Sequence, residues 1–403
     1  MVSSRTLILA GAGIGGLTAA LALARRGFRV LVLEQTERLQ ETGAGLQLSP
    51  NAARVLIALG LEDRLKANVV APTAIRVRSA RSGRDIACLP VARAEKYYGA
   101  PYWVIHRADL QAALLSAAQE HPDIEIQLGT RLEEFAAHTN GVTAAFSCGA
   151  RSGDATGIGL IGADGLWSAV RARLWGEAAP RLVGRTAWRA LVSTEAVAPE
   201  FREPVVHLWI GPDGHIVLYP VRRGTALNIV AITTDNWTGQ GWSTRSDRDE
   251  LLSRFPARKW TKQALTLLAT PERWLKWALY DRPPLPRWGR GPVTLLGDAA
   301  HPMVPFLAQG AAMAIEDAAV LADVLAERSG IPAAMRQYEA RRRPRTARVQ
   351  HAALANGRIY HLGGPAALLR NVTMKFLLGS ELVLSRYDWI YDWRPPEMVA
   401  RVP

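Results

Sequence analysis

A glycine-rich stretch near the N-terminus decides the fold of this chain: Arg5-Thr6-Leu7-Ile8-Leu9-Ala10-Gly11-Ala12-Gly13-Ile14-Gly15-Gly16. The apolar residues 5–10 predict a buried strand, and the Ala- and Leu-rich residues 17–26 predict a helix. A second apolar run over 28–33 predicts a further strand. Together they form a compact strand–turn–helix–strand unit, with the glycines in the turn that opens the helix.

That turn carries the pattern G-x-G-x-x-G, in which each glycine has its own physical purpose. Gly11 allows the tight turn, Gly13 lets a pyrophosphate approach the backbone, and Gly16 lets helix and strand pack closely. The start of the helix, which includes Gly15, offers free N–H groups and a partial positive charge to phosphates. Glu34 ends the second strand, where its carboxylate can accept hydrogen bonds from ribose hydroxyls. The unit is therefore predicted to bind a dinucleotide.

A second strand end, far downstream, indicates which dinucleotide is bound. Gly297-Asp298 follows the apolar run 293–296 and precedes a helix that begins near Gly310 and Ala311. A carboxylate at this point can bind polyol hydroxyls, and the positive end of a helix can face an anionic ring. FAD has both features, because it carries a ribityl chain and a pyrimidine edge that becomes anionic on reduction. The alternative is that Asp298 only caps a loop.

The composition is typical of a packed globular protein. Of 403 residues, 49% are hydrophobic and 21% are charged, which excludes an intrinsically disordered chain. Cys88 and Cys148 are too few for a disulfide framework or a four-cysteine zinc site, so we expect two buried small side chains and no metal site. Neither a signal peptide nor an apolar run long enough to span a membrane is recognisable, which predicts a cytoplasmic protein.

The formal net charge of +13 could indicate nucleic acid, anionic lipid or anionic small molecules as partners. The densest basic run, Arg341-Arg342-Arg343-Pro344-Arg345, lies at a predicted helix end, and no nucleic-acid-binding module is recognisable. We therefore predict that the arginines cover solvated faces. We expect no nucleic-acid partner and no integral membrane association.

The chain is too long for one ordinary core, so a large domain and a smaller one are expected. Pieces rich in Val, Trp and Ile predict a mostly antiparallel sheet inserted into an α/β frame: 186–194, 205–210, 215–221 and 226–233. The predicted fold class is α/β, with a Rossmann-type FAD-binding domain (GR2-like, with a mixed sheet), an inserted substrate domain and a C-terminal helical segment. We place the FAD-binding domain in 1–72, 95–180 and 281–345, the substrate-binding domain in 73–94 and 181–280, and the helical segment in 346–403.

Three motifs resemble the fingerprints of the single-component (class A) FAD-dependent aromatic hydroxylases: residues 11–16 with Glu34, Ala163-Asp164-Gly165, and Gly297-Asp298-Ala299-Ala300-His301-Pro302. The match extends from residue 5 to about residue 345. Within that family the chain is similar to the salicylate hydroxylase and 3-hydroxybenzoate 6-hydroxylase branch. The stretches that carry this closer likeness are 43–52, 106–110 and 387–391.

The resemblance implies an activity and a set of roles. These enzymes hold FAD noncovalently, are reduced by NADH or NADPH that docks transiently, and hydroxylate an electron-rich ring with O2 through a flavin C4a-hydroperoxide. Arg107 would contact the flavin, Gln111 would lie near the ribityl chain, and Asp298 would hold the ribityl hydroxyls. Asp164 would combine a structural role with one in nicotinamide docking. Gly45, in the first of the similar stretches, is counted with the cofactor-binding residues.

The inserted sheet offers a candidate proton relay for a substrate hydroxyl, since a phenolate is a better target for an electrophilic oxygen than a phenol. His215, Val217 and Tyr219 are spaced by two on one predicted strand and so share a face. We predict that His215 and Tyr219 are catalytic, and the branch resemblance implies a His and a Tyr four apart in the substrate pocket. The alternative is a surface histidine and a structural tyrosine. His207 is a weaker candidate.

Pro305 stands where the 3-hydroxybenzoate enzymes carry a glutamine, although its carbonyl is expected to remain available. The leading prediction is a small phenolic or hydroxypyridine-type aromatic acid as substrate, with a homodimer as one possible state. Two alternatives stay open. One is an epoxidase or hydroxylase of a lipophilic ring, of the quinone-precursor type, with a wholly apolar pocket. The other is a flavin-fold protein that binds FAD or RNA without turnover.

Overall fold

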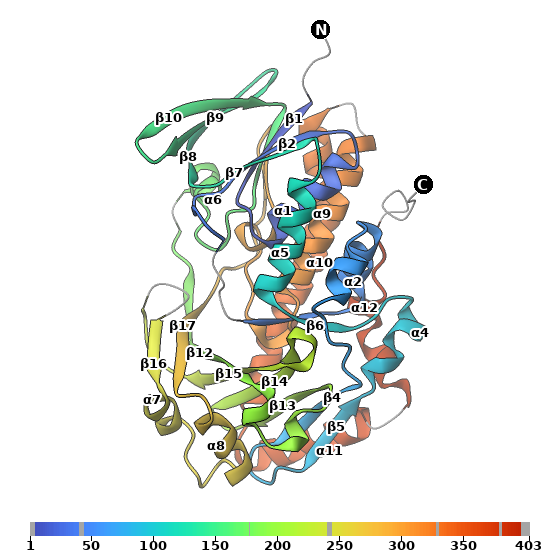
Figure 1. Cartoon of the computed structure of the whole chain (residues 1–403), viewed down its shortest axis with the longest axis vertical. Helices are drawn as coiled ribbons and strands as arrows, with labels where there is room; N and C mark the ends of the chain where they lie inside the picture. The colour runs from blue at the N-terminus through green and yellow to red at the C-terminus, as the bar shows by residue number, and fades with distance from the viewer. Residues whose placement is uncertain are drawn as a thin grey trace.

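The computed structural model describes residues 5–39, 44–176, 178–239, 244–327, 330–378 and 381–395. A parallel sheet of five strands lies in the upper half of Figure 1, and a sheet of eight strands lies in the lower half. The long helix α10 (Ile331–Tyr360) packs against the cores of both. The two sheets thus belong to two halves of the molecule that share one supporting helix.

The parallel sheet contains the predicted N-terminal unit at its centre. Its strand order is β18 (Val293–Leu295), β11 (Gly159–Gly162), β1 (Thr6–Ala10), β2 (Arg29–Leu33) and β7 (Ile124–Gln127). Its central strands β1 and β11 are apolar and buried, as expected for a sheet covered on both faces. The covering helices include α1 (Ile14–Ala24), α5 (Arg107–Gln119) and α9 (Gly310–Glu327). Helix α1 begins directly after Gly13, three residues earlier than predicted.

The eight-stranded sheet is antiparallel except where β4 and β13 run parallel. Its order is β16 (Thr244–Asp247), β17 (Arg273–Asp281), β12 (Arg181–Ser193), β15 (Ala226–Thr234), β14 (Gly214–Val221), β13 (Val205–Gly211), β4 (Ala74–Ser79) and β5 (Asp85–Leu89). Strand β17 was not predicted, because Lys276 interrupts its apolar run. The structure buries Lys276 and pairs its ammonium with Glu250 at 2.5 Å.

Smaller elements complete the chain. Strands β3 (Gly45–Leu48) and β6 (Trp103–His106) form a two-stranded ribbon, and β8 (Thr130–His138), β9 (Gly141–Cys148) and β10 (Arg151–Gly157) form an antiparallel sheet. The remaining helices are α2 (Pro50–Ala58), α3 (Glu62–Lys66), α4 (Ala94–Tyr98), α6 (Ala169–Trp175), α7 (Arg248–Ser253), α8 (Lys262–Ala269), α11 (Gly364–Leu378) and α12 (Asp388–Tyr391). None of the described helices is long and apolar enough to cross a membrane.

Three local predictions were wrong. The helix predicted over 49–66 is broken between α2 and α3, where Gly60 adopts a left-handed φ of 72° that a continuing helix does not allow. The basic run that ends at Arg345 is not at a helix end, because α10 continues through Pro344 to Tyr360 and so crosses residue 345. Cys88 and Cys148 are exposed rather than buried, since one lies on the edge strand β5 and the other ends β9.

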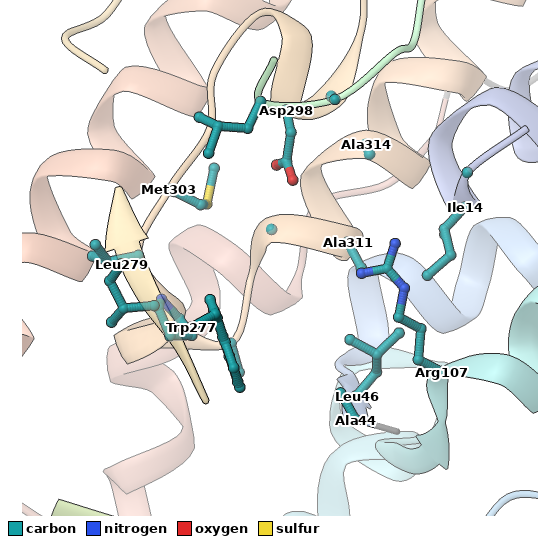
Figure 2. Close-up of a pocket in the computed structure, with 18 of the residues that line it drawn as sticks. Ile14, Ala44, Leu46, Arg107, Trp277, Leu279, Asp298, Met303, Ala311 and Ala314 are labelled. Carbon is teal, nitrogen blue, oxygen red and sulfur yellow. The ribbon is translucent and has the colours of Figure 1, made fainter. Parts of the chain in front are cut away.

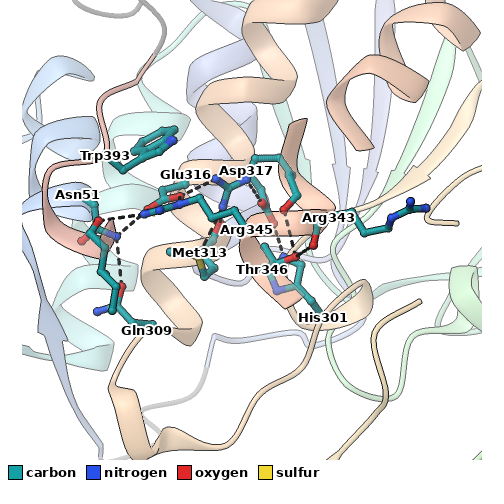
Figure 3. Close-up of polar contacts among 12 residues, drawn as sticks. Asn51, His301, Gln309, Met313, Glu316, Asp317, Arg343, Arg345, Thr346 and Trp393 are labelled. Carbon is teal, nitrogen blue, oxygen red and sulfur yellow. Dashed lines mark hydrogen bonds and ion pairs between the residues drawn. The ribbon is translucent and has the colours of Figure 1, made fainter. Parts of the chain in front are cut away.

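A buried polar network holds α9 against α10 (Figure 3). Asp317 and Glu316 of α9 accept hydrogen bonds from Nε and Nη1 of Arg342 at 2.6 and 2.5 Å. Asp317 also lies 2.5 Å from Nε2 of His301, in the loop that follows the short helix η5 (Gly297–Ala299). Through His301, the network holds the segment that carries Asp298 in place. The charges of Arg342, Glu316 and Asp317 are paired with one another.

Candidate active site

A cavity of about 340 Å³ lies at the carboxyl ends of the parallel strands, where α/β sheets commonly bind ligands. One wall comes from the parallel sheet and its helices: Gly13, Ile14, Gly15, Arg107, Ala163, Gly165, Leu296, Gly297, Asp298, Gly310, Ala311 and Ala314. The other wall comes from the eight-stranded sheet: Arg189, His215, Val217, Tyr219, Val230, Ile232, Trp277, Leu279 and Tyr280. Figure 2 shows Arg107 and Asp298 facing this cavity, with Trp277 and Leu279 across from Arg107.

The predicted glycines of the turn differ in what surrounds them. A Cβ on Gly11 would lie 2.5 Å from the carbonyl oxygen of Ala163, and one on Gly16 would lie 2.0 Å from the carbonyl oxygen of Gly11. A Cβ on Gly13 would meet no atom within 4 Å. Gly11 and Gly16 are thus required by packing, whereas Gly13 borders the open space of the cavity. This is the arrangement that a pyrophosphate approaching the backbone needs.

Glu34 and Gln111 brace the same turn. The Glu34 carboxylate accepts a hydrogen bond from the backbone N–H of Ala12 at 2.7 Å, and it also accepts two from Thr36 at 2.9 Å. The Gln111 side-chain amide donates to the carbonyl of Ala12 at 3.0 Å. Each oxygen of a carboxylate has two lone pairs, so Glu34 keeps acceptor capacity for ribose hydroxyls. Neither side chain lines the cavity itself.

Asp298 and Arg107 give polar groups to the wall formed by the parallel sheet and its helices, which we call the cofactor wall. The Asp298 side chain is exposed to the cavity rather than to the outer surface, and burial raises the pKa of its carboxyl, partly offset by His301 and Arg107. Burial lowers the pKa of the Arg107 guanidinium, and its Nε has no hydrogen-bond partner within the described part of the chain. An acceptor for polyol hydroxyls and an unsatisfied cation beside the open glycine turn are what FAD requires.

The predicted Asp164 supports α6. It accepts hydrogen bonds from the Ser168 hydroxyl at 2.5 Å and from the backbone N–H of Val170 at 3.1 Å. Burial raises the pKa of Asp164, while those bonds work against the shift. Asp164 does not line the cavity, although its neighbours Ala163 and Gly165 do. Its structural contribution is therefore visible, and its nicotinamide contribution stays a prediction.

The predicted relay residues lie together on the wall formed by the eight-stranded sheet, which we call the substrate wall. His215, Val217 and Tyr219 of β14 all face the cavity. Burial raises the pKa of the Tyr219 phenol, so Tyr219 is neutral at ordinary pH. A Cβ on Gly45 would lie 2.5 Å from the Tyr219 ring, and the Gly45 N–H donates to Asn228 Oδ1 at 2.7 Å. Gly45 is therefore glycine because the ribbon β3 passes directly against this tyrosine.

His215 has a partner that sequence reasoning missed. Its Nδ1 lies 2.7 Å from Nε2 of His361, which ends α10, and the two rings are stacked with centroids 5.0 Å apart. Burial lowers the pKa of His215 well below its ordinary value, and the His361 pKa falls to about 3. Both rings are neutral at pH 7, so one ring donates a hydrogen bond to the other. Because the two histidines are 146 positions apart in the sequence, no local pattern could have indicated the pair.

The weaker candidate His207 lies on the other face of the sheet. It is fully buried, packs edge-on against Phe201 with centroids 5.7 Å apart, and is not among the cavity residues. Burial, together with Arg78 and Arg76, lowers its pKa to about 3. The geometry therefore separates His207 from the site.

Arg189 is a second residue that sequence reasoning missed. It lies on β12, is 6% exposed and holds its guanidinium 3.3 Å from the ring centroid of Trp277. Burial lowers its pKa to about 9, with nearby Arg107 contributing. A lone charged residue inside the apolar run 187–192 is the signal that could have found it, because a strand rarely buries such a side chain without a reason.

Pro305 does line the cavity, as the first residue of the short helix η6 (Pro305–Leu307). Its carbonyl accepts the backbone N–H of Ala308 at 3.0 Å and keeps a second lone pair.

Comparison with known proteins gives a consistent result. A family model described as an FAD binding domain matches residues 4–353. The chain is 37% identical over 389 residues to 3-hydroxybenzoate 6-hydroxylase 1 of Aquipseudomonas alcaligenes, covering 96% of each protein. It is 38% identical over 395 residues to 3-amino-4-hydroxybenzoate 2-monooxygenase PtnB3 of Streptomyces platensis, covering 97% of this chain and 96% of that one. A solved salicylate hydroxylase substrate complex is similar with a TM-score of 0.83 and 27% identity, over 100% of this chain and 99% of the other.

Proposed function

Because this chain belongs to the FAD-binding family and is a flavoprotein aromatic hydroxylase, we propose that its substrate is a small phenolic or hydroxypyridine-type aromatic acid. The reaction would convert substrate–H, O2, NAD(P)H and a proton into substrate–OH, water and NAD(P)+. When bound, FAD supplies the electron transfer and the activation of O2. The observation that carries the proposal is one cavity in which His215 and Tyr219 share space with the glycine turn and Asp298.

In this proposal the substrate hydroxyl meets Tyr219. Its raised pKa keeps Tyr219 protonated, so the phenol can hydrogen-bond to the ring oxygen without itself becoming an anion. Neutral His215 can accept the proton of the substrate hydroxyl through Nε2, directly or through one water, because its Nδ1 is engaged with His361. The ring becomes more electron-rich as that proton leaves.

His361 extends the relay. If His215 donates from Nδ1 to Nε2 of His361, a proton gained at Nε2 of His215 can pass along the pair to His361, whose own Nδ1 is buried without a hydrogen-bond partner among the described residues. His361 is half-buried at the end of α10. It does not line the cavity, whereas His215 does, so it lies behind His215.

The apolar part of the lining fits the need to exclude water during the reaction. Leu46, Val217, Trp277, Leu279 and Met303 contribute it.

The lipophilic-ring alternative calls for a wholly apolar pocket, and the polar groups on the substrate wall disfavour it. The non-catalytic alternative is not supported, because the chain is similar to named monooxygenases over nearly its whole length. A cytoplasmic location and a homodimer stay predictions.

The test is a panel of hydroxybenzoates, aminohydroxybenzoates and hydroxypyridine carboxylates, with neutral lipophilic phenols as the contrasting set. NADH and NADPH oxidation would be followed together with product mass under 18O2. We expect at least one acid to accelerate flavin reduction and to gain a single labelled oxygen atom. If no acid does so and a neutral ring does, the proposed substrate class is wrong.

A further inference from the structure

We propose that Arg189 is the carboxylate-binding residue of the substrate pocket, where its guanidinium pairs with the carboxylate of the aromatic acid. This inference rests on the proposed function, and it adds a specific binding site that the predicted relay does not contain. Arg189 comes from the substrate wall, on β12, and lines the same cavity as Tyr219 and Asp298.

The first observation is that Arg189, like Arg107 on the cofactor wall, lacks the partners that the other buried arginines of the described residues have. Arg342 pairs with two carboxylates. Arg171 donates to the carbonyls of residues 299 and 300, and Arg370 donates to those of residues 359 and 360. Within the described ranges, Arg189 has no ion pair and no hydrogen bond, and its Nε is buried without a partner. A buried cation left in this state is unfavourable unless a ligand completes it.

The second observation is the way in which the guanidinium is held. Its centre lies 3.3 Å from the ring centroid of Trp277, so one face is covered by the indole. The N–H groups of arginine lie in the plane of the guanidinium, and a carboxylate binds along that edge with two parallel hydrogen bonds. Trp277 therefore fixes the group while leaving its donors free. An arginine oriented in advance loses less entropy when a ligand binds.

The third observation is the register of the sheet. Arg189 of β12 is paired with Val230 of β15, which is paired with Val217 of β14. Tyr219 is the next residue on that face of β14, so two strand spacings sideways and two residues along the strand, together about 12 Å, separate its backbone from that of Arg189. The long arginine side chain covers part of this gap. One aromatic ring can therefore place its carboxylate at Arg189 and its hydroxyl toward Tyr219.

The charges around the cavity support an anionic ligand. Arg107 and Arg189 contribute two positive groups, and Asp298 is the carboxylate among the described lining residues. Because Arg107 and Asp298 lie on the cofactor wall, Arg189 is the cation that remains for the substrate.

The experiment compares an acid with its amide in the oxidised holoenzyme, without NAD(P)H, so that no turnover occurs. The probes are 3-hydroxybenzoate and 3-hydroxybenzamide, and binding is followed by the change in flavin absorbance. We expect the natural chain to bind the acid about 10- to 100-fold more tightly than the amide, which is the usual effect of one charge-assisted hydrogen-bonded pair. Arg189→Gln should bind both probes equally, and Arg189→Lys should keep part of the preference.

The matched control is Arg181→Gln, which removes an exposed arginine from the same strand and should leave the preference unchanged. The inference is overturned if Arg189→Gln still prefers the acid, or if Arg189→Gln and Arg189→Lys both lose FAD. It is also overturned if the natural chain binds acid and amide equally. The proposed function fails separately, if no aromatic acid stimulates NAD(P)H oxidation by the natural chain.

Discussion

The polar network under α9 and the substrate wall both bury an arginine, but they treat its charge in opposite ways. Burial alone would lower the pKa of Arg342, yet Glu316 and Asp317 raise it above its ordinary value. Arg189 has no such partner among the described residues, and burial lowers its pKa to about 9. In the network under α9 the buried charges are paired with one another. On the substrate wall the charge of Arg189 is unpaired and faces the cavity.

This difference separates a supporting region from a ligand-binding one. Under α9, Asp317 accepts from Arg342 and contacts His301, so the loop before α9 is held by paired groups. On the substrate wall, Nδ2 of Asn228 and Nε of Arg189 are buried without partners in the described chain. Since folded proteins pair nearly all their buried polar atoms, an unpaired guanidinium that lines a cavity indicates where a ligand can complete it.

The glycine turn contains both closely packed positions, Gly11 and Gly16, and an open one, Gly13. A substitution at the open position should have the largest effect of those predicted, the loss of FAD. Gly13→Val should abolish FAD binding while the apoprotein still folds, because the added side chain meets only the open space beside the turn. Flavin absorbance of the purified protein measures the cofactor, and circular dichroism measures the fold. Gly330→Val is a matched control at another glycine with open space around it, outside the cavity. Full FAD occupancy in Gly13→Val would show that the turn does not hold the pyrophosphate.

The stability of the two arginine variants tests the comparison directly. Arg342→Met leaves Glu316 and Asp317 buried without their cation, which should lower the free energy of unfolding by about 3–5 kcal/mol. Arg189→Met removes an unpaired cation and should change the free energy of unfolding by less than about 1 kcal/mol. Urea denaturation of both holoproteins measures the two values. Equal losses would mean that Arg189 has a structural role like that of Arg342.

Tyr219→Phe probes the substrate wall without altering its charge. Coupled hydroxylation should fall by about 10- to 100-fold, the lower range for one general acid–base element, while substrate-stimulated flavin reduction persists. More NAD(P)H should then end as hydrogen peroxide, which a peroxidase-coupled assay measures beside the hydroxylated product. Unchanged rate and coupling in both Tyr219→Phe and His215→Ala would place the proton route elsewhere.

The smallest expected effect concerns the two faces of the eight-stranded sheet. His207 has a pKa of about 3 in the folded chain and an ordinary value near 6.5 when unfolded. Below pH 6.5 the unfolded chain binds a proton that the folded chain does not, so stability falls as the pH drops from about 6.5 toward 3.

His207→Leu should therefore reduce the slope of unfolding free energy against pH in this window, by up to about 1.4 kcal/mol per pH unit. Urea denaturation at pH 5 and pH 7 measures the slope. Hydroxylation should be unchanged, because His207 lies away from the cavity. A loss of coupled hydroxylation in this variant would contradict the assignment of the two sheet faces.

Local patterns were sufficient for the parts of the molecule that short-range physics controls. The spacing of Gly11, Gly13 and Gly16 after an apolar strand predicted the turn, because packing excludes a side chain at Gly11 and Gly16 and Gly13 borders the open space of the cavity. The period of two along β14 placed His215 and Tyr219 on one face, since successive strand side chains alternate. The α/β class with an inserted antiparallel sheet followed from the same kind of pattern.

Long-range packing decided the rest. A period of two says which residues share a face, but it does not say what covers that face. Only the return of α10 to the sheet places His361 at 2.7 Å from His215, and only the pairing of β12 with β17 places Trp277 under Arg189. The same packing put His207 on the far face. Whether a buried polar group is paired or left open depends on contacts between residues tens to hundreds of positions apart, and tertiary structure alone brings those residues together.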